Sequence, residues 1–95
     1  MRKFTEDERK LFRAIVSITE EEECANFFED ICTIKEIKDL SQRLCVAKML
    51  KKGDRYQDIE AATGASTATI SRVNKCLVYG SGGYLSVLEK MDEDK

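Results

Sequence analysis

The 95-residue sequence contains no proline and no histidine, and only 7% of its residues are aromatic. With 42% apolar and 36% charged residues, the absence of proline favours a helical globular chain over a disordered, collagen-like or β-sandwich one. The absence of histidine removes the usual catalytic base, and both acid–base and nucleophilic catalysis need a positioned base. The composition therefore predicts an all-α protein that is not an enzyme.

The four cysteines do not form a metal-binding pattern. Cys24, Cys32, Cys45 and Cys76 lie 8, 13 and 31 residues apart, which matches no zinc-ligand spacing. We expect no metal site and no cofactor of this kind, and free thiols that pack as small core residues in a reducing compartment. The first eight residues are followed by no uninterrupted apolar stretch, so the sequence predicts neither a secretion signal nor a membrane span, and hence a cytoplasmic protein without a membrane partner.

Length and charge distribution indicate the organisation of the chain. A chain of this size makes one domain, residues 1–95, and buries only about 60–65% of the surface that its unfolded form exposes, which makes a homodimer plausible. Residues 1–40 carry seven Lys or Arg against eleven Asp or Glu, residues 41–79 seven against three, and residues 80–95 two against four. The middle of the chain is basic and both ends are acidic, so a polyanionic partner is expected to bind the middle.

Helix starts are marked by a threonine followed three residues later by glutamate, a pair that satisfies two backbone donors reciprocally. Three such capping boxes occur: Thr5 with Glu8, Thr19 with Glu22, and Thr33 with Glu36. The first predicted helix has an apolar stripe of Leu11, Phe12, Ile15 and Val16. The third and longest is expected to end at Gly53. A glycine-rich joint at 80–83 precedes a last short amphipathic helix with Tyr84, Leu85, Leu88 and Met91.

Residues 56–79 have the pattern of a helix-turn-helix. A short helix from Tyr56 to about Thr63 is followed by Gly64, and Ser66 is expected to cap a second helix that runs to about Tyr79. Small or apolar residues that would pack the two helices together recur at Ile59, Ala62, Ala65, Ile70 and Val73. A helical hairpin that only packs is the alternative interpretation of this segment.

The outer face of the second helix of this pair carries short or cationic side chains and no carboxylate. It is expected to enter the major groove of double-stranded DNA without repelling phosphates, since hydroxyl groups and arginine there can donate to phosphates and base edges. The predicted DNA-binding residues of the segment are Gln57, Ser66, Thr67, Ala68, Thr69, Ser71, Arg72 and Lys75. Lys51 and Lys52 are added to this set, although lysines at the end of the third helix also complement its negative pole.

Four segments between Thr33 and Leu77 carry a resemblance to a known family. In order they are Thr33-Ile34-Lys35-Glu36, Leu40-Ser41-Gln42-Arg43, Met49-Leu50-Lys51-Lys52-Gly53-Asp54 and Gly64-Ala65-Ser66-Thr67-Ala68-Thr69-Ile70-Ser71-Arg72. With them the chain resembles the Trp-repressor superfamily, and most closely its YerC/YecD-type branch of Trp-repressor-related proteins. The resemblance implies an intertwined helical homodimer whose terminal helices share one core and whose two helix-turn-helix units bind half-sites about one helical turn apart.

The resemblance also implies an effector site. In that family an amino-acid corepressor lies between the third helix and the recognition helix. Thr33, Arg43 and Arg72 match family residues around this ligand. The departures are Val73 in place of glycine, Cys76 in place of serine, and Asp30 and Cys32 in place of two leucines.

These departures argue against tryptophan as the ligand. A branched side chain at Val73 takes volume that an indole needs, and overfilling a packed site commonly costs about 1–3 kcal/mol. Asp30, if it faces the pocket, favours a polar or cationic amino acid such as histidine, because a buried carboxylate needs a partner. The alternative is that Arg43 and Arg72 contact phosphates and that no effector exists.

Two function classes follow from these observations. The first is a sequence-specific transcriptional regulator, a repressor responsive to an amino acid, that binds a palindromic operator as a homodimer. The second is a helical protein-interaction module without sequence-specific DNA binding, whose basic segment meets an acidic partner or RNA. Affinity for duplex DNA that falls steeply with salt, together with preference for a palindrome, separates the first class from the second.

Overall fold

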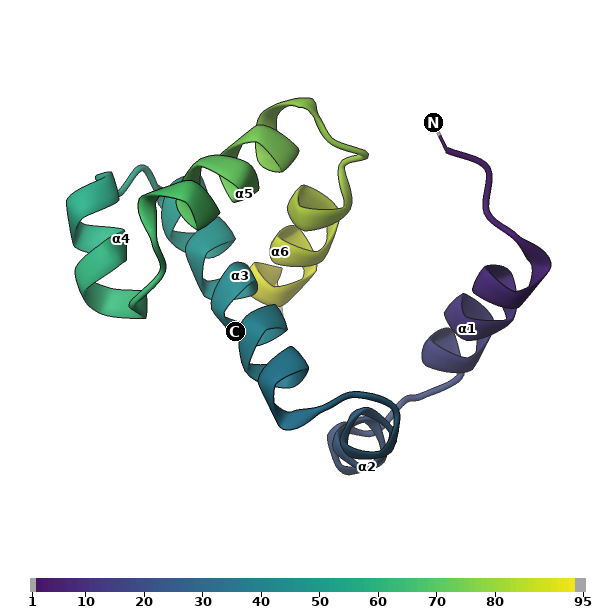
Figure 1. Ribbon diagram of the computed structural model, residues 1–95. Coiled ribbons are helices and arrows are strands. Elements are labelled where there is room, and N and C mark those ends of the chain that lie inside the picture. The colour runs from purple at the N-terminus through teal and green to yellow at the C-terminus, as the bar shows by residue number, and fades with distance from the viewer. Residues whose placement is uncertain (1, 94–95) are drawn as a thin grey trace. The chain divides into compact units, whose positions relative to one another are not determined.

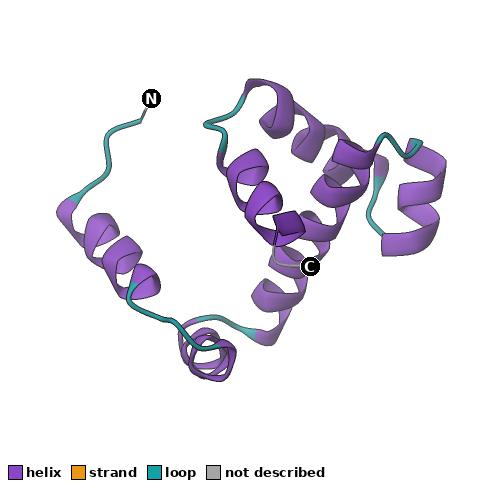
Figure 2. Cartoon of the chain, turned by 180° about the vertical axis from the view of Figure 1, so that it is seen from behind, coloured by secondary structure: helices purple, strands orange, loops and turns teal. Residues whose placement is uncertain are grey.

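The computed structural model describes residues 2–93, and every regular element within this range is an α-helix, as the all-α prediction requires (Figures 1 and 2). The helices are α1 (Glu6–Val16), α2 (Glu21–Ile31), α3 (Ile34–Lys52), α4 (Tyr56–Thr63), α5 (Thr67–Tyr79) and α6 (Gly83–Glu93). The chain forms two compact units, Met1–Ile37 and Lys38–Lys95, which are described separately. No helix within the described range is long and apolar enough to span a membrane.

The first unit begins with the predicted capping box. The Thr5 hydroxyl accepts a hydrogen bond from the Glu8 backbone N–H at 3.0 Å, and the Glu8 carboxylate accepts one from the Thr5 backbone N–H at 2.9 Å. The backbone N–H of Thr5 and, next to it, the Arg2 guanidinium stabilise the charged carboxylate and hold the pKa of Glu8 below its ordinary value. This helix start is fixed by local chemistry.

The second predicted box, Thr19 with Glu22, does not form. The N-cap of α2 is Glu20, which has extended backbone angles and makes no side-chain capping bond. A box joins the N-cap residue to the third helical residue, and with Glu20 as N-cap that residue is Glu23. The helix starts one residue later than the Thr19 pattern predicts, and three glutamates in its first turn still complement the helix dipole.

The apolar side chains of the first unit remain largely uncovered. Neither α1 nor α2, both described in full, has a buried residue. Phe4 and Phe12 meet edge to face with ring centroids 5.0 Å apart, but Val16 is 80% exposed and Ile31 51% exposed. The predicted apolar stripe of α1 therefore exists, and no part of its own unit buries it.

Both ends of α3 are as predicted. Thr33 and Glu36 form a capping box at its start: the Thr33 hydroxyl accepts from the Glu36 N–H at 3.1 Å, and the Glu36 carboxylate from the Thr33 N–H at 2.8 Å. At its end Gly53 adopts a positive φ of 95°. The Gly53 N–H donates to the Leu50 carbonyl and the Asp54 N–H to the Met49 carbonyl, both at 3.0 Å, which is a Schellman motif.

The second unit holds the hydrophobic core. Its buried residues come from α3, α4, α5, α6 and the turn before α5: Val46, Ala47, Ile59, Ala65, Ile70, Val73 and Leu88. Partly buried Leu44 and Tyr84 pack against them, and α6 lies beside α3 and α5 (Figure 1). The core fixes α4 and α5 on α3.

Two expectations about packing were wrong. Ala62, expected to face α5, is exposed, because the single apolar anchor of α4 is Ile59. Cys45 and Cys76, expected in the core, are also exposed, whereas Cys24 and Cys32 are half-buried. All four thiols are free.

Candidate nucleic-acid interface

The turn of the α4–α5 pair, residues 56–79, is held by hydrogen bonds on both sides of Gly64. Gly64 has a left-handed φ of 74°, and its N–H donates to the Glu60 carbonyl at 2.9 Å. The Thr63 hydroxyl donates to the Ile59 carbonyl at 2.7 Å and accepts from the Ala65 N–H at 3.1 Å. The side-chain amide of Gln42 on α3 donates to the Thr63 carbonyl at 3.1 Å. The turn is thus anchored to α4 and to α3.

Ser66 caps α5 as predicted. Its hydroxyl accepts a hydrogen bond from the Thr69 N–H at 3.1 Å and donates one to the Thr69 hydroxyl, also at 3.1 Å. Below the cap, Ile70 and Val73 are buried, which fixes the rotation of the helix. The opposite face of α5 is therefore directed outward.

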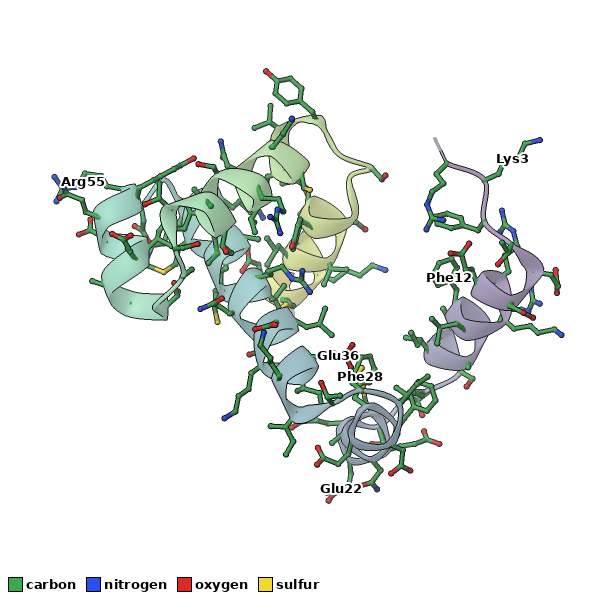
Figure 3. All side chains as sticks on the ribbon, viewed as in Figure 1. Lys3, Phe12, Glu22, Phe28, Glu36 and Arg55 are labelled. Carbon is green, nitrogen blue, oxygen red and sulfur yellow. The ribbon has the colours of Figure 1, made fainter. Side chains whose placement is uncertain are left out.

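The outward face contains most of the predicted DNA-binding residues. Thr69 is half-buried, and the exposed members of the set are Gln57, Ser66, Thr67, Ala68, Ser71, Arg72 and Lys75. Arg55, just before α4, extends away from the helix and pairs with Asp58 at 3.3 Å (Figure 3). The α4–α5 helix pair thus presents hydroxyl, amide and cationic groups together. Phosphates and base edges accept hydrogen bonds from donors of these kinds.

A carboxylate from the neighbouring helix α4 lies at the edge of this face. The Thr67 hydroxyl donates to the Glu60 carboxylate at 3.2 Å, although the two residues are on different helices. The face of α5 itself is free of carboxylates, as the sequence predicts, because α5 has no acidic residue in its first turn. The tight turn brings Glu60 of α4 to the amino end of α5.

The two lysines at the end of α3 are exposed and have acidic neighbours. Lys51 Nζ lies 3.5 Å from an Asp92 carboxylate oxygen on α6, and Lys52 Nζ lies 3.5 Å from one of Asp54. Lys51, Lys52 and Asp92 also line a hollow of about 240 Å³ between α3 and α6. Exposed pairs of this kind contribute little to stability.

Some of the residues predicted to hold an effector meet at a pocket in the second unit. Arg43 and Cys76 line an apolar hollow of about 580 Å³ formed by α3, the end of α5 and α6. Arg72 is exposed on the outer face of α5, and Val73 is buried in the core. Thr33 and Asp30 belong to the first unit; both are exposed, and the Thr33 hydroxyl caps α3.

The sequence matches the Trp repressor protein family over residues 6–92. The chain belongs to the Trp repressor family. The match includes α1 to α5 and nearly all of α6, so the family assignment applies to the acidic terminal helices as well as to the α4–α5 pair. The resemblance drawn from the four segments is confirmed, and it places the chain among regulatory DNA-binding proteins.

Individual members of the family are close in sequence and in structure. Protein YerC of Bacillus subtilis (strain 168), itself uncharacterised, is 54% identical over 84 residues, which are 88% of this chain and 81% of YerC. A crystal structure of a candidate Trp repressor from Staphylococcus aureus is 48% identical, covers 94% of this chain and 89% of its own, and superposes with a TM-score of 0.90. A TrpR-like protein from Eubacterium eligens ATCC 27750 is 53% identical, covers 93% and 91%, and has a TM-score of 0.89.

Proposed function

We propose that this member of the Trp repressor family is a transcriptional repressor that binds duplex DNA through the α4–α5 pair acting as a helix-turn-helix. One observation carries the proposal: the buried face of α5 is fixed by Ile70 and Val73, so that its outer face presents Thr67, Ser71 and Arg72 to solvent. A helix rotated and capped in this way is suited to the major groove, with its first residues against base edges. The protein carries out no catalysis and acts in the cytoplasm.

The regulator is proposed to bind as a homodimer to a palindromic operator. The apolar faces of α1 and α2 are not buried within their own unit, and a second copy offers a surface of the same kind to bury them. Twofold symmetry of the protein requires twofold symmetry of its site, with the half-sites about one helical turn apart. The alternative class, a protein-interaction module, predicts no such preference.

Fluorescence anisotropy on specific and scrambled duplexes tests the recognition surface. Arg72→Ala and Thr69→Ala are expected to weaken or relax sequence-specific binding, each by about 1–3 kcal/mol, because they remove groups that contact bases. Lys51→Ala or Lys52→Ala is expected to weaken binding to all duplexes and to make the salt dependence shallower, because each lysine neutralises a phosphate. Equal binding by all four variants would contradict the assignment, and binding of no duplex would favour the interaction module.

A second candidate function is regulation by an amino acid, favoured by the pocket that Arg43 and Cys76 line. Its volume of about 580 Å³ is within the range of small-molecule sites, and the guanidinium of Arg43 is suited to a carboxylate. In line with the departures at Val73 and Asp30 in the sequence, the proposed ligand is an amino acid that is smaller or more polar than tryptophan. Thermal-shift measurements with a panel of amino acids test this, because a ligand that binds only the folded state raises its melting temperature. If no amino acid raises the melting temperature and operator binding needs no amino acid, the proposal of an amino-acid effector is wrong.

A further inference from the structure

The carboxylate at the edge of the recognition surface requires an explanation that the proposed function does not give. Glu60 is exposed on α4, and its Oε2 accepts a hydrogen bond from the Thr67 hydroxyl, with 3.2 Å between the two oxygens. Thr67 is the first residue of α5, the end of a recognition helix that meets base edges. Any duplex held by Thr67 therefore also meets the carboxylate of Glu60.

The contact with Thr67 restricts the Glu60 side chain. A carboxylate has about four lone-pair positions, and the threonine hydroxyl occupies one of them. A glutamate already held by such a bond loses less conformational entropy when it binds a further donor. Glu60 is thus a preorganised acceptor next to the residues expected to contact bases.

The chemistry of DNA restricts what this acceptor can bind. Phosphate oxygens are anionic acceptors that repel a carboxylate, whereas the exocyclic amino groups in the major groove are donors. Glutamate commonly pairs with the N4 amino group of cytosine. Arg72 and Lys75 on the same outer face of α5 supply positive charge that offsets the repulsion between Glu60 and the DNA as a whole.

We propose that Glu60 is a specificity-determining residue that selects cytosine at one position of each half-site, with Thr67 as the residue that positions its carboxylate. The inference rests on the proposed function, because it needs a duplex bound at α5. The other role for this carboxylate is structural: it would join α4 to α5 and interact with the positive end of the α5 dipole, without contacting DNA.

Selection of bound fragments from random duplex pools separates the two roles. The wild-type chain is expected to enrich cytosine at one position per half-site, and Glu60→Gln to lower that preference about tenfold while the preferences elsewhere in the half-site persist. Glu89→Gln is the matched control, because it removes the same charge from an exposed position on α6 and is expected to select as the wild type does. If the Glu60 carboxylate is purely structural, Glu60→Gln would change the base preference at every position of the half-site together, or at none.

Two further variants test the positioning role of Thr67. Thr67→Ser keeps the hydroxyl and is expected to keep the cytosine preference, whereas Thr67→Val removes the hydroxyl and is expected to lower the preference at the same position that Glu60→Gln affects. The glutamine amide oxygen still accepts from Thr67, so Glu60→Gln is expected to fold, which circular dichroism checks. If it unfolds, Thr67→Val alone gives the answer, since a loss confined to that one position supports the proposal and an unchanged preference overturns it.

The outcomes also distinguish this inference from the proposed function. Absence of any sequence preference in the wild-type chain would overturn both. Sequence-specific binding by the wild type with an identical base preference in Glu60→Gln would overturn the assignment of Glu60 and leave the repressor proposal intact.

Discussion

At the scale of single residues, the turn of the α4–α5 pair depends on the backbone of Gly64. Its φ of 74° lies in the left-handed region, and a Cβ built there would meet nothing within 4 Å. Gly64→Ala is therefore expected to lower the free energy of unfolding by about 1–2 kcal/mol, from backbone strain alone. Urea denaturation followed by circular dichroism measures this. Gly83→Ala is the control: its site is equally open and has no positive φ, so the variant is expected to be neutral or slightly more stable.

A second residue-scale prediction concerns pH and the start of α1. The pKa of Glu8 is lowered in the folded chain by the Thr5 backbone N–H and by Arg2, so the ionised form stabilises the capping box. This contribution is fully present above the ordinary glutamate pKa of about 4.3 and is lost as pH falls through the lower, folded value. The Thr5 amide resonance is expected to titrate in that acidic range by NMR. In Glu8→Gln the titration should disappear, and its persistence would show that a group other than Glu8 causes it.

At the scale of elements, α6 restrains the basic end of α3. Asp92 of α6 pairs with Lys51 at 3.5 Å, so a phosphate must displace a carboxylate to reach this lysine. Asp92→Asn is expected to raise affinity for every duplex, because Lys51 then has no carboxylate partner to lose, and to keep the wild-type slope of log K against log salt, because Lys51 neutralises one phosphate in both chains. Anisotropy titrations at several salt concentrations measure both. Glu89→Gln is the charge-matched control, and an equal effect of the two variants would assign the change to net charge instead.

The sequence predicted elements whose ends are set by neighbouring residues. The Thr5 and Thr33 boxes, the Gly53 end of α3 and the Ser66 cap each depend on a few adjacent side chains, and all were found. The predicted capping box of Thr19 did not form, because several adjacent glutamates allow α2 to start at more than one residue. Local chemistry is thus sufficient where a single helix start is favoured.

Contacts between elements were less predictable. Thr67 meets Glu60 only because the turn folds α5 back against α4, and no pattern within either helix indicates that contact. The spacing of Ala62 from Ile59 predicts an inward position, yet the short α4 buries Ile59 alone. For the candidate site, the sequence identified the exposed face of α5 and its cations, whereas the contacts that Glu60, Asp54 and Asp92 make with this site appeared only with the folded chain.

At the scale of the whole molecule, apolar surface is distributed unevenly between the two units. The second unit has a core to which four helices contribute, whereas α1 and α2 of the first bury no residue. Burial of apolar area is the main favourable term in folding, so helices that bury none are stable only when something else covers them. The proposed homodimer would meet this need with a second copy of the chain, and it would also place two α4–α5 pairs on one duplex.

The dimer can be tested by a substitution that removes no packing within the chain. Val16 is 80% exposed, so Val16→Ser is expected to leave the second unit unchanged and to weaken dimerisation about tenfold or more, since burying a valine side chain contributes about 1.5–3 kcal/mol. Sedimentation equilibrium across micromolar concentrations measures the dissociation constant. Ala61→Ser, an exposed position on α4, is the control and should dimerise as the wild type does. A wild-type chain that is monomeric at these concentrations would leave α1 and α2 uncovered, and the intertwined dimer would then be wrong.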